Sequence, residues 1–191
     1  EMLQEHPELY DQVEETVLFQ DTLMPEVADG SVDVAVSFRN THNWSGRWEG
    51  HSVDAYFQAV ARVLRPGGIF GIVQHRAPEG TEHGEDGTIG YLTESFVIGR
   101  AEAAGLELAE RSEMHANPRD THDHPEGVWS LPPVMRGDSD PEAMRAIGES
   151  DRMTLTFRKP DATAVEDGTA APDNTAAEAT AAEATSEEAA P

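Results

Sequence analysis

The segment RNTHNW, residues 39–44, places polar and aromatic side chains directly after an apolar run. The imidazole of His42 titrates near neutral pH and can accept a proton from a reacting group. The amides of Asn40 and Asn43 can orient a small acceptor, and the indole of Trp44 can cover a flat or cationic ligand. This pattern predicts proton-transfer chemistry on a bound molecule. The alternative is that His42 and Asn43 only cap the loop and that Trp44 packs against the following helix.

A second polar pair, His75 and Arg76, follows the apolar run IFGIVQ at 69–74. His75 is a second candidate base, and Arg76 is a candidate ligand for a carboxylate on the acceptor. An Arg76 that pairs with an acid of a later loop is an equally good interpretation, because that loop is rich in Asp and Glu.

The long loop at 116–151, which we call the lid, carries a third group in which His122 and His124 alternate with carboxylates. A histidine pair with flanking acids is typical of divalent-metal sites, so a metal-binding module is one alternative function. Such short clusters also arise by chance in acidic loops, and we expect no metal site. We expect instead that Glu126 and Trp129 close over the acceptor, since long irregular loops often act as lids.

Alternating helices and strands are predicted to hold these groups. The run at 32–38 is a nearly continuous apolar strand, a pattern typical of strands buried on both faces. A single apolar stripe, a Ser52 cap and the stop RPGG predict a helix at 52–64. Because the carboxyl ends of parallel strands meet at one edge of a sheet, we expect His42 and His75 to face one crevice. The other predicted elements are a helix at 89–104 and strands at 16–20, 69–74, 106–113 and 153–157.

Length, composition and charge limit the possible functions. The 191 residues predict one domain, residues 1–160, followed by a disordered acidic tail rich in Ala, Thr, Glu and Pro, residues 161–191. The absence of cysteine excludes disulfides, thiolate metal sites and cysteine nucleophiles. A net charge of −24 disfavours nucleic acid as a partner. No apolar run approaches the length of a membrane span. The oligomeric state is left open.

Five distinctive segments follow one another along the chain: FRNTHNW (38–44), QHRA (74–77), GYLTESFVIGRAEAAGL (90–106), ANPRDTHDHPEGVWSLPP (116–133) and IGESDRMTLTFRKP (147–160). Together they resemble a group of bacterial predicted methyltransferases within the class I S-adenosylmethionine-dependent family. The resemblance implies a Rossmann-like α/β fold, a three-layer sandwich with a mostly parallel sheet. It also implies methyl transfer from S-adenosylmethionine to a small-molecule acceptor. The cofactor contacts that it implies are Asp21, Ser37, Phe38 and Arg39, although Asp21 could equally cap a turn.

The chain departs from this family at its N-terminal side. Class I methyltransferases begin with a strand, a glycine-rich turn, a helix and a second strand that ends in an acid. No such segment precedes Asp21. We therefore expect a C-terminal portion of the fold, with one side of the strand at 32–38 unpaired and with weak or absent cofactor binding and catalysis. A non-catalytic remnant that binds a partner polypeptide is another alternative. The resemblance suggests the periplasm, with the cytoplasm as the alternative.

Overall fold

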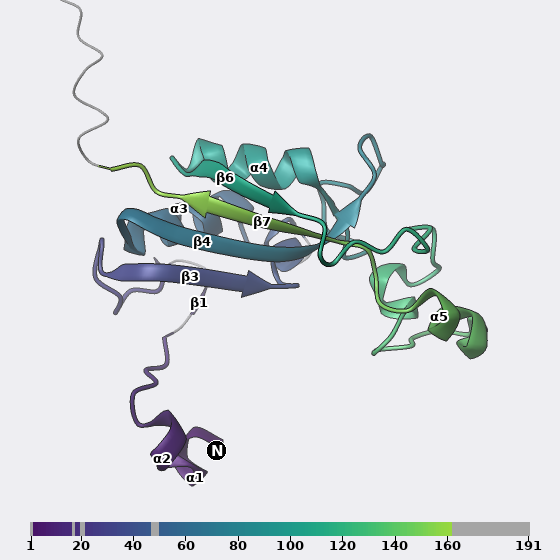
Figure 1. Ribbon diagram of the computed structural model, residues 1–191, viewed down its shortest axis with the longest axis horizontal. Helices are drawn as coiled ribbons and strands as arrows, with labels where there is room; N and C mark the ends of the chain where they lie inside the picture. The colour runs from purple at the N-terminus through teal and green to yellow at the C-terminus, as the bar shows by residue number, and fades with distance from the viewer. Residues whose placement is uncertain (1, 17, 20–21, 47–49, 162–191) are drawn as a thin grey trace, which may run out of the picture.

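The computed structural model describes residues 2–16, 18–19, 22–46 and 50–161 (Figure 1). Two sequence predictions, the role of Asp21 and the disorder of the tail from residue 162 on, lie outside these ranges. Within the described ranges, no helix is both long enough and apolar enough to cross a membrane.

Five strands form the main sheet, and their pairing is mixed. Strand β4 (Leu64–Ala77) pairs in parallel with β3 (Val32–Phe38) and, near its carboxyl end, with the short strand β5 (Leu92–Thr93). Strand β7 (Arg152–Arg158) pairs antiparallel with β4 on one side and with β6 (Glu107–Ser112) on the other. The strand order is β3-β4-β7-β6, which confirms the predicted α/β fold and adds two antiparallel pairings to it.

Two helices, α3 (Val53–Val63) and α4 (Glu94–Ala103), cover one face of this sheet (Figure 1). They lie side by side, and an ion pair of 3.2 Å joins Asp54 to Arg100. Their apolar faces meet side chains from the central strands in one core, which includes Phe57, Val60, Phe70, Val97, Leu155 and Phe157. This core fixes the sheet that carries the candidate site.

The helix starts follow local capping. The Ser52 hydroxyl accepts a hydrogen bond from the backbone N–H of Ala55 at 3.2 Å, which confirms the predicted cap of α3. The helix predicted at 89–104 begins later than expected, because residues 92–93 pair with β4 and the Thr93 hydroxyl caps α4.

One face of β3 is open in the described structure, contrary to the prediction that both faces are buried. The side chains of Val34, Val36 and Phe38 are 59%, 62% and 63% exposed, while Ser37 on the opposite face is buried. The apolar pattern predicted a layer on each side, but α3 and α4 lie on the same side. In the described ranges β3 is also a sheet edge, as expected for an unpaired strand.

The N-terminal region forms small separate pieces. Helices α1 (Met2–Glu5) and α2 (Pro7–Tyr10) flank His6, and Pro7 stands at the start of α2. The strand expected at 16–20 is instead half of a short antiparallel hairpin, β1 (Leu18–Phe19) with β2 (Thr22–Leu23), which does not join the main sheet.

The lid contains two short helical pieces, a 3-10 turn at Gly127–Ser130 and α5 (Pro141–Ile147). In Figure 1 the α5 part of the lid lies beyond the end of the sheet where the β3 arrow finishes. The lid therefore stands at the edge where strand-end side chains were predicted to converge.

Candidate active site

The chain turns sharply at the end of β3 and places His42 in a buried position. Arg39 has a φ of +52°, a left-handed conformation, and its backbone N–H donates to the carbonyl oxygen of Val73 at 2.7 Å. A 3-10 turn, Thr41–Trp44, then carries the 4%-exposed His42. Gly87, with a φ of +66°, lies against the His42 backbone so closely that a Cβ there would overlap the His42 carbonyl.

Gln74 on β4 fixes the orientation of the His42 ring. The Gln74 amide nitrogen donates to the carbonyl oxygens of Gly90 at 2.8 Å and of His75 at 3.4 Å. Nδ1 of His42 lies 3.3 Å from the Gln74 amide oxygen and 3.2 Å from the Gln74 amide nitrogen, so Gln74 contacts this edge of the ring. In the tautomer whose Nδ1–H donates to the Gln74 oxygen, Nε2 is the basic nitrogen of the ring.

His75, at the end of β4, lies beside His42, with 5.6 Å between the ring centroids. Its Nδ1 is 2.5 Å from the hydroxyl oxygen of Ser150. Burial, followed by the positive charges of His42, Arg152 and Arg39, lowers the pKa of His75 to about 3. His75 is therefore neutral at pH 7 and a poor base, because a base is most effective when its pKa lies near the working pH.

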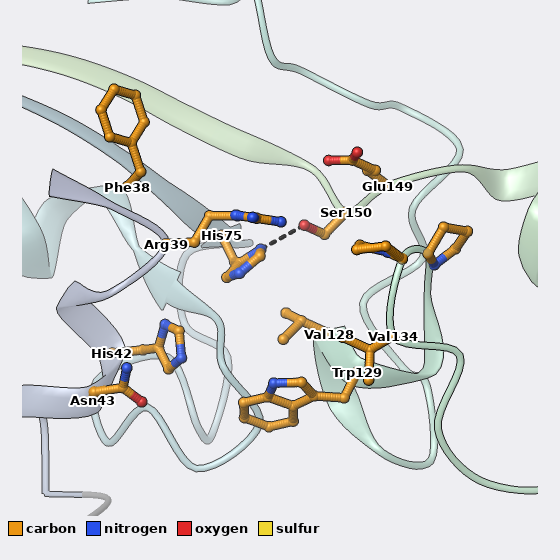
Figure 2. A pocket seen from close by; sticks show the side chains of 12 residues that line it. Phe38, Arg39, His42, Asn43, His75, Val128, Trp129, Val134, Glu149 and Ser150 are labelled. Carbon is orange, nitrogen blue, oxygen red and sulfur yellow. Dashed lines mark hydrogen bonds between the residues drawn. The ribbon is translucent and has the colours of Figure 1, made fainter. Parts of the chain in front are cut away.

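These two histidines line a cavity of about 390 Å³ between the strand ends and the lid (Figure 2). Figure 2 shows Arg39 and His75 on one side of it, and Val128, Trp129 and Val134 across from the histidines. We call this cavity the His42 pocket. Its lining is Phe38, Arg39, His42, Asn43, His75, Val128, Trp129, Pro132, Pro133, Val134, Glu149 and Ser150.

A second cavity, of about 500 Å³, adjoins β3, and we call it the β3 cavity. It shares Phe38 and Arg39 with the His42 pocket. Its polar side chains are Ser37, Arg39, Asn40 and Tyr56, and no carboxylate belongs to its described lining. The lining is Leu18, Met24, Ala35, Val36, Ser37, Phe38, Arg39, Asn40, Tyr56, Val60 and Phe70.

The structure brings together His42, His75, Asn43 and Trp129, as the sequence predicted. Asn43 donates from its side-chain nitrogen to the side-chain oxygen of Asn40 at 2.7 Å, which holds both amides at the junction of the two cavities. The ring centroid of Trp129 lies 5.9 Å from that of His42. Predicted residues from β3, β4 and the lid therefore meet in one pocket.

Trp44, Arg76 and Glu126 do not line the His42 pocket. Trp44 is 5% exposed and stacks on Tyr56 at 5.3 Å between centroids, so it belongs to the core, as the alternative interpretation had it. The backbone N–H of Glu126 donates to the hydroxyl of Ser130, and the Glu126 side chain is exposed.

Arg76 is held by acids on the other side of the sheet. Its guanidinium donates to both carboxylate oxygens of Asp151, at 2.9 and 3.1 Å, and to both of Glu113, at 2.9 and 2.8 Å. Successive side chains on a strand point to opposite faces, so His75 and Arg76 cannot enter the same pocket. The structure favours the ion-paired interpretation of Arg76 over acceptor binding.

The lid histidines belong to a buried network around Asp120, which we call the Asp120 cluster. The Asp120 carboxylate accepts from the Tyr91 hydroxyl at 2.8 Å, from Nε2 of His124 at 2.8 Å and from the backbone N–H of Asp151 at 2.7 Å. The backbone N–H of His122 donates to it at 3.0 Å. Among the described residues, no group of three or more His, Asp or Glu side chains is placed to hold a metal ion.

Sequence reasoning assigned no role to Gln74 and treated Ser150 only as part of a junction. A signal for Gln74 was present: a buried strand that ends in Gln rather than an apolar residue implies a polar partner in the core. No comparable signal pointed to Ser150, because its contact with His75 joins residues 75 positions apart.

Comparison with known proteins supports this description of the fold. Residues 1–72 match the family model described as a methyltransferase domain. The [4+2]-cyclase SpnF is 16% identical with a TM-score of 0.53, over 82% of this chain and 59% of that one. Geranyl diphosphate C-methyltransferase from Streptomyces coelicolor is 14% identical with a TM-score of 0.51, over 82% and 57%. No curated protein matches.

A third solved structure, a putative sarcosine dimethylglycine methyltransferase from Galdieria sulphuraria, is 16% identical with a TM-score of 0.50, over 83% of this chain and 66% of that one. The chain thus spans less than two thirds of the length of these three structures. At such identities the likeness shows the fold alone, and SpnF illustrates that one fold carries more than one chemistry. The match of residues 1–72 to the methyltransferase-domain model agrees with this fold, and the chain is similar to S-adenosylmethionine-dependent methyltransferases in both respects.

Proposed function

We propose that the chain contributes the acceptor side of an S-adenosylmethionine-dependent methyltransferase, with the acceptor in the His42 pocket. One observation carries this proposal: His42 is buried at a strand end beside a cavity, and Gln74 contacts the Nδ1 edge of its ring. A buried, oriented imidazole beside a cavity of about 390 Å³ suits proton removal from a small acceptor.

The β3 cavity is the proposed site of the methyl donor. Its volume of about 500 Å³ suits a nucleoside-sized ligand such as the methyl donor, and Ser37 and Asn40 offer polar contacts for the amino-acid end of the cofactor. The described lining offers no carboxylate for the ribose hydroxyls, so these residues fit the cofactor only in part. When bound, the cofactor supplies an electrophilic methyl group.

The residues of the His42 pocket have separate tasks in this proposal. His42 accepts the acceptor's proton at Nε2, while Gln74 holds Nδ1–H. Asn43 and Trp129 position the acceptor, which matters because methyl transfer depends on alignment. His75 remains neutral and packs beside His42, so it acts as a wall of the pocket.

A His42→Gln variant tests the proposal. S-adenosylhomocysteine release from S-adenosylmethionine is measured by mass spectrometry, with a panel of small acceptors that present oxygen, nitrogen and carbon nucleophiles. We expect His42→Gln to lower the rate roughly 10²- to 10⁴-fold, because a general base contributes about that much. The control, His83→Gln, changes a residue paired with Asp86 outside the pocket and leaves the rate unchanged.

Calorimetric titration with S-adenosylhomocysteine separates binding from chemistry. We expect both variants to bind it like the parent chain, and more weakly than low micromolar, because the described lining lacks the ribose-binding acid. Equal rates for the His42→Gln variant and the parent, or no S-adenosylhomocysteine binding at millimolar concentration, would contradict the proposal.

A further inference from the structure

The His42 pocket presents positive charge in a strongly acidic protein. The chain has 37 acidic and 13 basic residues. Glu149 is the one acid in the described lining of the pocket, and the Arg152 guanidinium lies 2.8 Å from its carboxylate. The Glu149–Arg152 pair has no net charge. Arg39 is therefore the charged side chain of the described lining whose charge is not balanced by an ion pair.

Arg39 differs from most other arginines of the chain. Within the described ranges, no carboxylate forms an ion pair with its guanidinium, although the protein has acids in excess. Figure 2 shows its side chain extended over His75 toward Ser150, along the wall of the pocket. The arginines that do have an ion-pair partner are Arg62, Arg65, Arg76, Arg100, Arg111, Arg152 and Arg158.

The pKa of His75 reflects the same positive charges beside the pocket. After burial, the groups that lower its pKa are His42, Arg152 and Arg39, all of which are positive or become so on protonation. A neighbouring negative charge would raise this pKa instead. The potential at the His75 ring therefore favours an anion.

The opposite wall suits a flat apolar body. Val128, Trp129 and Val134 face His75 across the cavity in Figure 2, and Pro132 and Pro133 also belong to the lining. An indole face and aliphatic side chains bind aromatic rings through apolar contact. A ligand that spans the pocket thus meets a cation at one side and an apolar surface at the other.

We propose that the acceptor of the His42 pocket is a small organic carboxylate with a flat apolar body, and that Arg39 binds its carboxylate. This inference rests on the proposed methyl transfer. Because Arg39 also lines the β3 cavity, the carboxylate of the methyl donor is a second source of the same chemistry.

Calorimetric titrations of the full chain separate the two sources. Phenylacetate and its neutral counterpart phenylacetamide are the acceptor probes. S-adenosylhomocysteine and 5′-methylthioadenosine, which lacks the amino-acid group, are the donor probes. The variants are Arg39→Gln and the matched control Arg145→Gln, an exposed arginine on α5 away from the pocket.

We expect the parent chain to bind phenylacetate roughly two- to fivefold more tightly than phenylacetamide, as an ion pair with the exposed Arg39 side chain allows. Arg39→Gln abolishes this preference and Arg145→Gln retains it. If Arg39→Gln weakens S-adenosylhomocysteine but neither 5′-methylthioadenosine nor phenylacetate, Arg39 serves the donor and the inference is overturned. Equal binding of phenylacetate and phenylacetamide by the parent chain also overturns it.

The failures of the two proposals are distinguishable. S-adenosylhomocysteine binding without a preference for phenylacetate refutes the carboxylate inference and leaves methyl transfer standing. A preference for phenylacetate that depends on Arg39, without any S-adenosylhomocysteine binding, refutes methyl transfer and shows an anion site.

Discussion

The His42 pocket and the Asp120 cluster are both buried polar groups at the lid end of the sheet, but their hydrogen bonding differs. In the Asp120 cluster one carboxylate accepts four donors, from Tyr91, His122, His124 and Asp151, and its residues close on one another. In the His42 pocket, Gln74 and Ser150 hold one edge of each histidine, and the rings line a cavity.

This difference in hydrogen bonding distinguishes a structural cluster from a binding site. The sequence drew attention to both, because both are rich in His and Asp or Asn. A buried network whose members satisfy one another stabilises the fold, whereas polar groups that line a cavity have hydrogen-bonding capacity left for a ligand. We therefore expect changes in the Asp120 cluster to affect stability and changes in the His42 pocket to affect binding.

The largest stability effect is expected from Asp120→Ala. This change leaves three buried donors and the part-buried N–H of His122 without their acceptor and should cost about 3–5 kcal/mol in the free energy of unfolding. Urea denaturation measures it. Asp123→Ala, at an exposed carboxylate of the same loop, is the control. Its urea midpoint should equal that of the parent chain. Similar midpoints for both variants would show that the cluster does not anchor the lid.

A smaller, pH-dependent effect is expected from His75→Gln. The pKa of His75 is about 3 in the folded chain, against an ordinary value of 6.5 that applies to the unfolded chain. Between these values the unfolded chain binds a proton that the folded chain does not, so stability falls as pH falls below 6.5. The loss is about 1.4 kcal/mol per pH unit, or roughly 2 kcal/mol between pH 6.5 and 5.

The His75→Gln side chain does not titrate, so its stability should fall less steeply over that range. The comparison is made from urea denaturation of both chains at pH 7, 6.5, 6 and 5. Parallel pH profiles for the two chains would mean that His75 is not held neutral, which would remove the distinction drawn between His42 and His75 as bases.

Local signals predicted the elements well. The apolar stripe, the Ser52 cap and the RPGG stop placed α3 within one residue at each end, because all three act within a few residues of the helix. The order of β3, α3 and β4 likewise predicted that His42 and His75 would meet, since strand ends converge at one edge of a sheet.

Long-range partners were not predictable in the same way. The open face of β3 depends on whether helices cover one face of the sheet or both. The apolar pattern of the strand does not distinguish these two arrangements. Arg76 and Asp151 are 75 positions apart, and nothing local says that this acid, rather than an acceptor, meets the guanidinium. Trp44 was ambiguous between site and core until its stacking on Tyr56 was visible.

The most direct test of the central claim is side-chain ¹H–¹⁵N NMR of the histidine rings during a titration with S-adenosylhomocysteine and phenylacetate together. If the His42 pocket binds ligand and the Asp120 cluster only holds the lid, the ring signals of His42 and His75 shift while those of His122 and His124 stay in place. Shifts confined to His122 and His124, with His42 and His75 unchanged, would contradict the account.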